Sequence, residues 1–421
     1  MRILWHMPRL QLSGCGLSQR ALRLARELTR AGHRVAFAAP EDKTDLVEAR
    51  AVEFPLWRYP AHRRRPLHWS LQSLERLRFA ADAATHFQSS RHDLFVTCQA
   101  EMVLAYRRHG AGAPVVFVCG GSSLLQEPRE TSEQRAHSLF ARPAFALDRV
   151  LRRRMERGAF RAADANVFDS ATTRALVVEQ YGIPGDNCRA IVGGVDVDEF
   201  SPASGVEKAA FRQSLGIAAG QPVVVWTGRL SPEKNVGLLI RAAARCDPRC
   251  TLILVGDGPL QLELQELAGA EGIGERTIWA GRVADVRPYL RAADVFAFPS
   301  LGESFGGALV EAMACGLPCI ALRPDARLVR TANAEIINHG ATGWLVDGPS
   351  EQAFAAGLES LLADAALRSR LAAGAREKCE RAFSWRRAGE ELAELVGTVP
   401  SRVISAPGSP RDGFPCALPS T

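Results

Sequence analysis

The sequence predicts an α/β protein with two doubly wound parallel-sheet domains, and three observations lead to that prediction. The chain has 421 residues, more than one hydrophobic core usually supports, so two domains are expected. Short apolar stretches typical of buried strands alternate with amphipathic helical stretches, which is the pattern of parallel α/β folds. A polar segment near residues 200–220 separates two such series and marks the expected domain boundary.

The first series begins with a strand at Arg2–Trp5 and continues with a helix over residues 17–32. One face of that helix carries the apolar residues Leu17, Ala21, Leu24, Ala25 and Leu28. Gly32 ends the helix, and RVAFAA (34–39) follows as the next strand. Further strands are expected at residues 93–98, 114–119, 165–170 and 189–194.

The second series repeats the alternation of strands and helices. Its strands are expected at residues 222–228, 251–258, 277–281, 294–300 and 318–322. Ligands of such folds favour the carboxyl ends of parallel strands and the cleft between domains. From about Thr398 the chain is rich in Pro, Ser and Gly, which predicts a flexible tail.

Composition is that of an ordinary soluble globular protein, with 47% hydrophobic and 23% charged residues. No apolar run is long enough for a membrane-spanning helix, and the first residues are too briefly apolar for a signal peptide, so a cytoplasmic protein is expected. Among the ten cysteines, the close pairs Cys246/Cys250 and Cys315/Cys319 lack the spacing of zinc or redox sites, which favours buried reduced thiols.

The net charge of +6 is concentrated in the first half of the chain, in residues 62–66 and 149–161. A basic helix can attract anionic lipid or nucleic acid, although a solvated arginine-rich surface also explains it. No interleaving of aromatic and basic residues indicates nucleic-acid binding. We therefore expect no nucleic-acid partner, leave weak contact with a membrane surface open, and derive no oligomeric state.

Two cations follow the first strand of the second series, in the stretch TGRLSPEKN (227–235). Arg229 and Lys234 would lie at the carboxyl end of that strand. An arginine grips a phosphate with a planar fork and a lysine supplies a compact charge, so the diphosphate of a sugar nucleotide suits the pair. An exposed loop without function would carry the same residues.

The stretch GESFGGALVEAMACGLP (302–318) places Glu303 after a strand and Glu311 in the following helix. The intervening Gly306 and Gly307 let a ligand approach the backbone, and a helix N-terminus attracts phosphate. If the interval is helical, the two carboxylates lie on the order of 10 Å apart, which suits a sugar at one and a ribose at the other. Alternatively, Glu303 caps the helix and Glu311 faces solvent.

Together these motifs resemble the retaining, nucleotide-sugar-dependent glycosyltransferases of family 4, which have the GT-B fold. Glu303 and Glu311 match the E-x7-E pattern of the family, and Gly228, Arg229 and Lys234 match its diphosphate loop. LVGDGP, AGRV and GATGWLVDG, at residues 254–259, 280–283 and 340–348, also fit.

The resemblance implies two Rossmann-like domains that face a cleft. It assigns residues 1–201 to an acceptor-binding domain and residues 202–384 to a nucleotide-sugar-binding domain. Residues 385–397 would form a helix that returns to the first domain, and residues 398–421 would form the flexible tail.

The resemblance also implies residue roles. Arg229 and Lys234 would bind the diphosphate and stabilise the departing charge, and with Glu303 they are the catalytic candidates. Glu311 would bind the ribose, and Arg282 with Val283 would lie beside the base. The donor-site candidates are Gly16, Gly228, Arg229, Lys234, Gly256, Arg282, Val283, Glu303, Ser304, Phe305, Gly306, Gly307, Leu309 and Glu311.

The first half departs from the family in two places. Only Gly16 of the usual glycine pair is present, because Cys15 occupies the other position, and Cys119 stands where many members have a histidine. His6 is a candidate at the end of the first strand, although a lone histidine more often serves packing. The acceptor-side candidates are His6, Gln99, Glu101, Cys119, Gly120 and Ser122.

The resemblance implies transfer of a sugar from a nucleoside diphosphate sugar, expected to be UDP-linked, with retention of configuration. Attack would come from the leaving-group side, with a phosphate oxygen taking the acceptor proton. No DxD-like metal site stands in a suitable place, so we expect no metal and no cofactor.

The start of the chain also resembles bacterial enzymes that glycosylate aminoglycoside antibiotic cores, which suggests a small acceptor such as an aminoglycoside or pseudodisaccharide. Acidic residues that could receive a polycationic acceptor are Glu41, Asp42, Asp45, Glu101, Glu127 and Glu130. A lipid or polysaccharide acceptor at the membrane surface is the alternative, favoured by Arg63–Arg65 and Arg152–Arg154. A sugar-nucleotide epimerase and a non-catalytic sugar-nucleotide binder also stay open.

Overall fold

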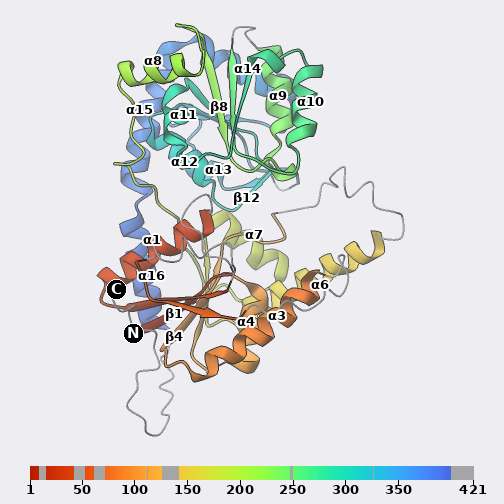
Figure 1. Cartoon of the computed structure of the whole chain (residues 1–421), viewed down its shortest axis with the longest axis vertical. Helices are drawn as coiled ribbons and strands as arrows, with labels where there is room; N and C mark the ends of the chain where they lie inside the picture. Colours follow the sequence, from red (N-terminus) through yellow and green to blue (C-terminus); the bar gives the residue numbers. More distant parts are fainter. Residues whose placement is uncertain are drawn as a thin grey trace. The chain divides into compact units, whose positions relative to one another are not determined.

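The computed structural model divides the chain into two compact units (Figure 1). The first unit comprises Met1–Leu124, Glu130–Ile191 and Arg386–Thr421, and the second comprises Leu125–Arg129 and Val192–Trp385. The structure describes residues 1–8, 16–41, 53–60, 72–110, 112–125, 142–246, 250–325 and 327–399.

The described part of the first unit contains a seven-stranded parallel sheet with the strand order β3-β2-β1-β4-β5-β6-β7. Its strands are β1 (Arg2–His6), β2 (Arg34–Pro40), β3 (Leu56–Tyr59), β4 (Leu94–Thr97), β5 (Val115–Cys119), β6 (Ala165–Phe168) and β7 (Cys188–Ala190). The strands β4, β5 and β6 are buried along their whole length, as expected of parallel strands with both faces covered.

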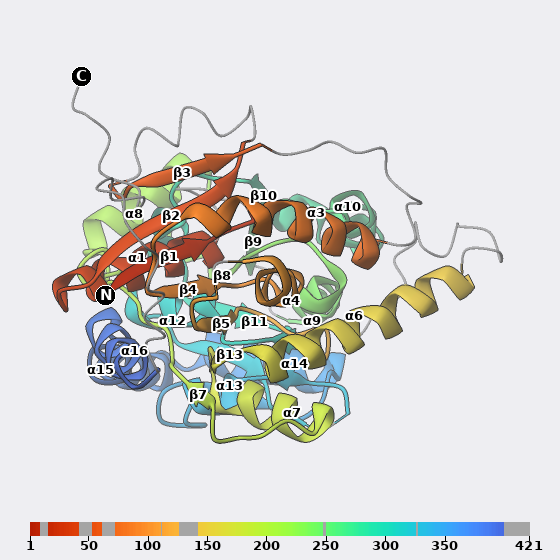
Figure 2. The same ribbon diagram turned by 90° about the horizontal axis from the view of Figure 1, so that it is seen from below.

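Helices cover this sheet because each presents an apolar face to it. They are α1 (Gly16–Arg30), α3 (Gln72–His86), α4 (Ala100–His109), α6 (Arg142–Ala162) and α7 (Ala171–Tyr181). The helix α4 packs against both α3 and α6 (Figure 2). The predicted apolar face of α1 is confirmed for Ala21, Leu24, Ala25 and Leu28, all of which are buried.

The last described helix, α16 (Trp385–Thr398), is grouped with the first unit from Arg386 onward. Gly389 lies so close to α1 that an added Cβ would stand 2.0 Å from the Cβ of Glu27. Glycine at this position therefore permits close packing of the two helices. The tail beyond Val399 lies outside the described residues.

The described part of the second unit holds a six-stranded parallel sheet with the order β10-β9-β8-β11-β13-β15 and a separate two-stranded sheet of β12 and β14. The strands are β8 (Val223–Thr227), β9 (Thr251–Val255), β10 (Thr277–Gly281), β11 (Val295–Phe298), β12 (Gly302–Glu303), β13 (Cys319–Leu322), β14 (Arg330–Thr331) and β15 (Trp344–Val346). The helical segments are α8 (Gly205–Ser214), η3 (Pro232–Lys234), α9 (Val236–Arg245), α10 (Gln261–Ala270), η4 (Gly274–Arg276), α11 (Arg287–Ala292), α12 (Gly307–Ala314), α13 (Asn333–Ile336), α14 (Glu351–Ala363) and α15 (Ala365–Ala382).

The strand order of the second sheet creates a topological switch point. The chain proceeds from β8 outward through β9 to β10, and then returns to the other side of β8 with β11. Loops that leave the carboxyl ends of β8 and β11 therefore diverge, and ligands of doubly wound sheets bind in the crevice that results. Both predicted donor motifs follow these two strands.

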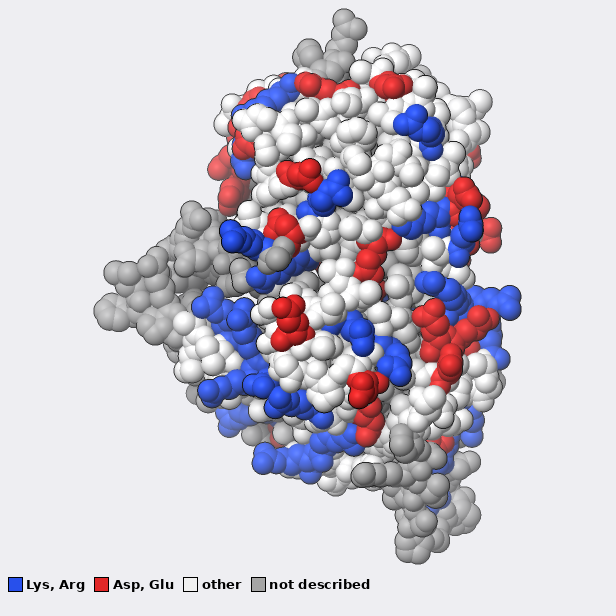
Figure 3. Space-filling model, turned by 180° about the vertical axis from the view of Figure 1, so that it is seen from behind, with Lys and Arg blue, Asp and Glu red and all other residues white. Residues whose placement is uncertain are grey.

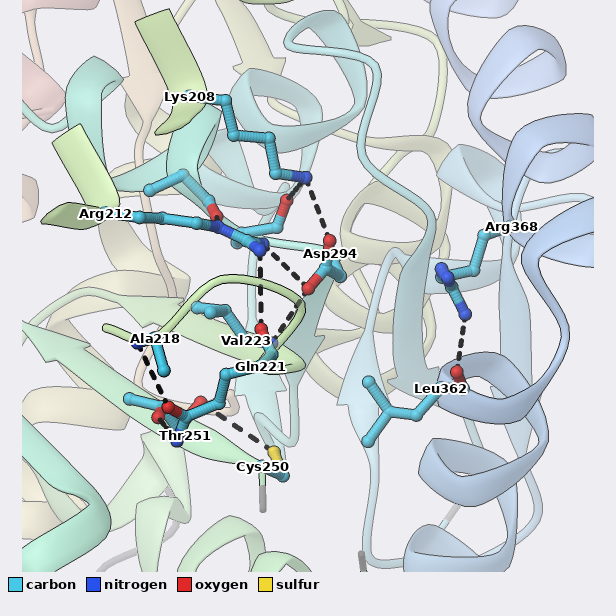
Figure 4. Close-up of polar contacts among 12 residues, drawn as sticks. Lys208, Arg212, Ala218, Gln221, Val223, Cys250, Thr251, Asp294, Leu362 and Arg368 are labelled. Carbon is cyan, nitrogen blue, oxygen red and sulfur yellow. Dashed lines mark hydrogen bonds and ion pairs between the residues drawn. The ribbon is translucent and has the colours of Figure 1, made fainter. Parts of the chain in front are cut away.

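At the opposite end of this sheet, where its strands begin, a half-buried carboxylate links the sheet to α8. Asp294, at the start of β11, accepts hydrogen bonds from Lys208 at 2.9 Å and Arg212 at 2.7 Å, both on α8 (Figure 4). It also accepts a bond of 2.9 Å from the backbone N–H of Val223. Burial alone would raise the pKa of Asp294, but the hydrogen bonds and charges of Lys208 and Arg212 outweigh it and lower the pKa.

The prediction of an α/β fold with two parallel sheets is confirmed. The short strands β3, β12, β14 and β15 were not predicted, because two to four residues leave almost no periodic signal. No helix in the described part of the chain is long and apolar enough to cross a membrane.

Candidate functional site

Glycines bring the loops after β8 and β9 into close contact. Gly228, with φ of 153°, donates a hydrogen bond of 2.9 Å to the carbonyl of Val255. A Cβ added to Gly256, whose φ is 131°, would stand 1.8 Å from the carbonyl oxygen of Gly228. The two loops can approach this closely only because both positions are glycine, and Arg229 follows directly on the loop so formed.

Arg229 offers an unused guanidinium at this edge of the sheet. Its side chain is exposed. Within the described ranges, no hydrogen bond or ion pair to its side chain is found; its carbonyl accepts the N–H of Ser231 at 2.9 Å. The charge of Arg229 is therefore available to an anionic ligand.

Lys234 and Glu303 form an ion pair between the two predicted motifs. Lys234 ends η3, and Glu303 ends β12. Their side chains are 20% and 21% exposed, so the pair lies near the surface without being fully solvated. The backbone fixes this contact, because the N–H of Leu301 donates to the carbonyl of Glu233 at 2.8 Å.

The N-terminus of α12 is open for a ligand. Gly306 is its cap residue, with φ of 105°, and no side chain caps the helix. Gly307, the first helical residue, is exposed. Unpaired N–H groups at such an end carry a partial positive charge. The side chain of Leu309 instead lies wholly in the core, so only its backbone can face a ligand.

Glu311 occupies a desolvated position on α12. The residue is half-buried, and burial raises the pKa of its carboxyl to about 7. No hydrogen bond or ion pair reaches this carboxyl from the part of the chain that the structure describes. A buried acid without a partner favours its neutral form, and a ligand hydroxyl would give it one.

The remaining donor-site candidates lie at other strand ends of the second sheet. Gly281 ends β10 with φ of 64°, and it is followed by exposed Arg282 and half-buried Val283. Ser304 is buried, and the ring of half-buried Phe305 packs against that of Phe383 at 5.8 Å. Gly16, by contrast, belongs to the first unit, where it begins α1.

His6 is enclosed in the first unit. It is 1% exposed, with Nδ1 at 3.1 Å from the Thr97 hydroxyl and Nε2 at 2.8 Å from the Tyr59 hydroxyl. Burial lowers the pKa of His6 to about 3, so the ring is neutral near pH 7. A packing role accounts for this geometry, and an acceptor role stays a prediction.

The other acceptor-side candidates cluster after β4 and β5. Gln99 is half-buried and precedes α4, and Glu101 is 9% exposed. Burial raises the pKa of the Cys119 thiol to about 12, which keeps it protonated and unreactive. Gly120 is exposed. Of the acidic acceptor candidates, Asp42, Asp45, Glu127 and Glu130 lie outside the described residues, as do Arg63–Arg65.

The sequence reasoning missed Glu156, which organises the loop after β5. Its carboxylate accepts hydrogen bonds from the hydroxyls of Ser122 at 2.9 Å and Tyr181 at 2.6 Å. It also accepts from the backbone N–H and the hydroxyl of Ser123, each at 3.0 Å. The position lies in an arginine-rich helical stretch that was interpreted only as a basic surface, and no motif marks it.

Two family models match the chain in succession. The model described as Glycosyltransferase Family 4 matches residues 15–199, and the model described as Glycosyl transferases group 1 matches residues 207–378. The first match falls mainly on the first unit, and the second falls within the second unit.

Curated relatives share about a third of their aligned residues with this chain. The D-inositol 3-phosphate glycosyltransferase of Xylanimonas cellulosilytica is 33% identical over 253 residues, which are 57% of this chain and 58% of the relative. That of Nocardia farcinica is 36% identical over 245 residues, 55% of this chain and 52% of the relative. The chain thus spans somewhat more than half the length of the curated relatives it matches.

Solved structures share the fold at low identity. Anabaena Alr3699/HepE in complex with UDP has a TM-score of 0.74 and 22% identity, over 94% of this chain and 100% of that chain. Sucrose-phosphate synthase from Thermosynechococcus elongatus has a TM-score of 0.76 and 20% identity, over 94% of this chain and 98% of that chain. With both family models matched in order, this chain belongs to the group 1, family 4 glycosyltransferases and has their GT-B fold.

Proposed function

We propose that the protein is a retaining glycosyltransferase that moves a sugar from a nucleoside diphosphate sugar to a hydroxyl of a small acceptor. The observation that carries the proposal is the Lys234–Glu303 pair beside exposed Arg229, at the switch point of the second sheet. The combination supplies two cations for a diphosphate and a carboxylate for sugar hydroxyls. The matched portion of the curated relatives supports the same reaction class.

The reaction requires stabilisation of the leaving diphosphate, whose negative charge grows as the glycosidic bond breaks. Arg229, Lys234 and the open N-terminus of α12 would stabilise that charge more in the transition state than in the ground state. The ion pair with Glu303 holds Lys234 in place before the donor arrives, so little reorganisation remains when the bond breaks. No step of this scheme requires a metal, and we propose that the enzyme needs no cofactor.

The donor is proposed to be UDP-linked. A solved structure with this fold binds UDP, which supports the choice without fixing it. In the proposed mode, Glu303 meets sugar hydroxyls, Glu311 meets the ribose and Arg282 with Val283 lies beside the base. Because its pKa is raised to about 7, Glu311 is protonated about half of the time near neutral pH. In that form it can both donate and accept a hydrogen bond, which suits a ribose diol.

The acceptor is proposed to be a small polyhydroxylated molecule. The curated relatives are named for inositol 3-phosphate, and an aminoglycoside-type acceptor remains a prediction from the sequence. In either case the proposed acceptor binds the first unit, at the loop after β5.

A lipid acceptor at a membrane surface is the second candidate, and one observation favours it. Exposed Arg154 and Arg157 lie on α6, together with Leu147 and Val150, which are 51% and 46% exposed. Figure 3 shows one face of the molecule, on which Lys and Arg side chains are spread among Asp and Glu side chains. Cationic and apolar residues together suit an anionic bilayer surface.

The decisive experiment is mass spectrometry of reactions with UDP-, GDP- and dTDP-sugars and a panel of acceptors, including inositol 3-phosphate, aminoglycoside cores and anionic glycolipid vesicles. Transfer to any added acceptor supports the proposal, and the acceptor that reacts distinguishes the two candidates. Isomerisation of the donor without transfer would instead identify an epimerase. A rate that falls when EDTA is added would contradict the metal-independent scheme.

A further inference from the structure

Backbone hydrogen bonds join three short segments of the second unit, which are η3, β12 and β14. The N–H of Leu301 donates to the carbonyl of Glu233 in η3 at 2.8 Å, and the N–H of Arg330 donates to the carbonyl of Leu301 at 2.7 Å. These bonds place β12 between η3 and β14. The catalytic candidate Lys234 lies on η3 and the catalytic candidate Glu303 lies on β12. No role has yet been given to β14.

The register of the two-stranded sheet aligns Thr331 with Glu303. Paired residues of adjacent parallel strands project their side chains to the same face of the sheet. The side chain of Thr331 therefore lies on the face that carries Glu303 and its partner Lys234.

This hydroxyl is buried without a partner. Thr331 is 0% exposed, and within the described ranges no hydrogen bond is made by its Oγ1. Ser300, two residues after the end of β11, is likewise 0% exposed, and its Oγ has no hydrogen-bond partner within the described ranges. Buried polar side chains in native proteins are nearly always hydrogen-bonded, so an exception beside a candidate catalytic carboxylate points to a partner that arrives with a ligand.

We infer that Thr331 is a specificity-determining residue that hydrogen-bonds a hydroxyl of the donor sugar. The inference rests on the proposed function, because it assumes a sugar beside Glu303. A carboxylate only accepts hydrogen bonds, whereas a hydroxyl donates and accepts. Glu303 and Thr331 side by side therefore recognise two neighbouring sugar hydroxyls, or one hydroxyl through both its proton and its lone pair.

The test compares binding of a nucleoside diphosphate with binding of its sugar conjugate, so no acceptor is needed. Calorimetry gives the dissociation constants of UDP and UDP-glucose, and of the GDP and dTDP pairs, for the wild type, Thr331→Val and Thr331→Ser. One sugar conjugate should show the largest gain in affinity over its free nucleoside diphosphate. For that conjugate, Thr331→Val is expected to weaken binding about tenfold. It should leave the affinity for the free diphosphate unchanged, and Thr331→Ser should retain the gain.

Two controls separate sugar recognition from a structural role. Thr251→Val removes a buried threonine hydroxyl that accepts a bond from Gln221 within the protein. Thr251 lies at the amino end of β9, away from the donor motifs, so this variant should leave both affinities unchanged. Thr331→Val should not lower the melting temperature of the free protein, because no bond within the described part is lost. A deoxy donor that lacks the recognised hydroxyl should bind Thr331→Val and wild type equally.

The possible failures are distinguishable. If the wild type binds no nucleoside diphosphate, the proposed function fails and the inference fails with it. If the wild type binds UDP or another diphosphate but gains nothing from the sugar, or if Thr331→Val keeps the full gain, the inference alone is overturned. A loss of affinity for the free diphosphate, or a lower melting temperature, would assign Thr331 a structural role instead.

Discussion

At the scale of single residues, the site combines a free cation with a paired one. Arg229 is exposed, whereas Lys234 is held by Glu303. The difference matters because a preorganised charge costs less reorganisation when the donor reacts, while an exposed charge must be ordered first. Both residues are expected to contribute to catalysis, Lys234 as a charge that is already in place and Arg229 as a charge that must be ordered first.

Arg229→Ala is expected to lower kcat/KM for sugar transfer about 100-fold, because loss of one donor to a developing anion costs roughly 3 kcal/mol of transition-state stabilisation. Steady-state kinetics with the active donor measures the effect. Arg381→Ala is the matched control, since Arg381 is 78% exposed and its ion pair with Glu377 lies within its own helix. Unchanged turnover in Arg229→Ala would remove Arg229 from the catalytic scheme.

Glu311→Gln is expected to change how stability depends on pH. Burial raises the pKa of Glu311 to about 7 in the folded state, so folding favours the protonated acid. Wild-type stability should therefore fall as the pH rises from about 4.5 to 7 and stay lowered above it, by at most about 3 kcal/mol. Urea unfolding at pH 5 and pH 8 measures the difference, which should shrink in Glu311→Gln. An equal pH dependence in both proteins would mean that Glu311 is not desolvated.

At the scale of elements, the donor motifs depend on turns whose geometry only glycine allows. Gly228 and Gly256 bring the β8 and β9 loops into backbone contact, and Gly306 opens the N-terminus of α12 with a positive φ. Gly228 and Gly256 directly follow the buried strands β8 and β9, and Gly306 directly precedes α12, so each stands where the chain turns sharply.

Gly256→Ala is expected to destabilise the protein by more than about 2 kcal/mol, since the new Cβ would collide with a backbone carbonyl at a positive φ. Gly269→Ala is the control, because Gly269 lies in α10 and, apart from the backbone of that helix, no described atom lies within 4 Å of the added Cβ. This variant should stabilise the protein by about 0.5–1 kcal/mol. Chemical denaturation of both variants measures the contrast. Equal stability of the two would mean that the β8 and β9 loops are not in close contact.

The attachment of α8 to the sheet is expected to contribute to the stability of the protein. Asp294→Ala leaves Lys208 and Arg212 without their carboxylate and should destabilise the protein by about 2–3 kcal/mol, below the cost for a fully buried pair because Asp294 is 19% exposed. Its lowered pKa means that this contribution is present near neutral pH and is lost as the pH falls through the folded-state pKa. Asp347→Ala, which breaks a pair with an 83% exposed carboxylate, should cost under about 1 kcal/mol. Thermal unfolding that ranks these variants in the opposite order would contradict the role of Asp294.

At the scale of the whole molecule, ligand binding should appear as added stability. A donor that binds the folded protein alone stabilises it by about 2.7 kcal/mol at 100 times its dissociation constant. The melting temperature should therefore rise with UDP concentration in the wild type, and the rise should be smaller in Arg229→Ala at equal concentrations. Thermal shift assays with UDP, GDP and dTDP measure it. A shift that is equal in both proteins would place nucleotide binding elsewhere.

Much of the fold could be read from the sequence, because helices and buried strands impose local periods of hydrophobicity. The helix α1 and the strands of both sheets that exceed four residues lie within predicted stretches or extend at most one residue beyond them. The strands β12 and β14 span two residues each, too few for any period to show. The candidate site was found in part, because Arg229, Lys234, Glu303 and Glu311 stand in motifs that residue type and spacing reveal.

The sequence by itself determined the alternation of strands and helices, the two sheets and the charged residues that follow particular strands. Only the tertiary structure decided that Lys234 contacts Glu303 across 69 residues of sequence and that Thr331 is aligned with Glu303. It also decided that Glu156 accepts a hydrogen bond from Ser122 in the loop after β5. The physical reason is that local patterns reflect the geometry of one element. Contacts between distant residues depend on strand order and register, which no short stretch of sequence encodes.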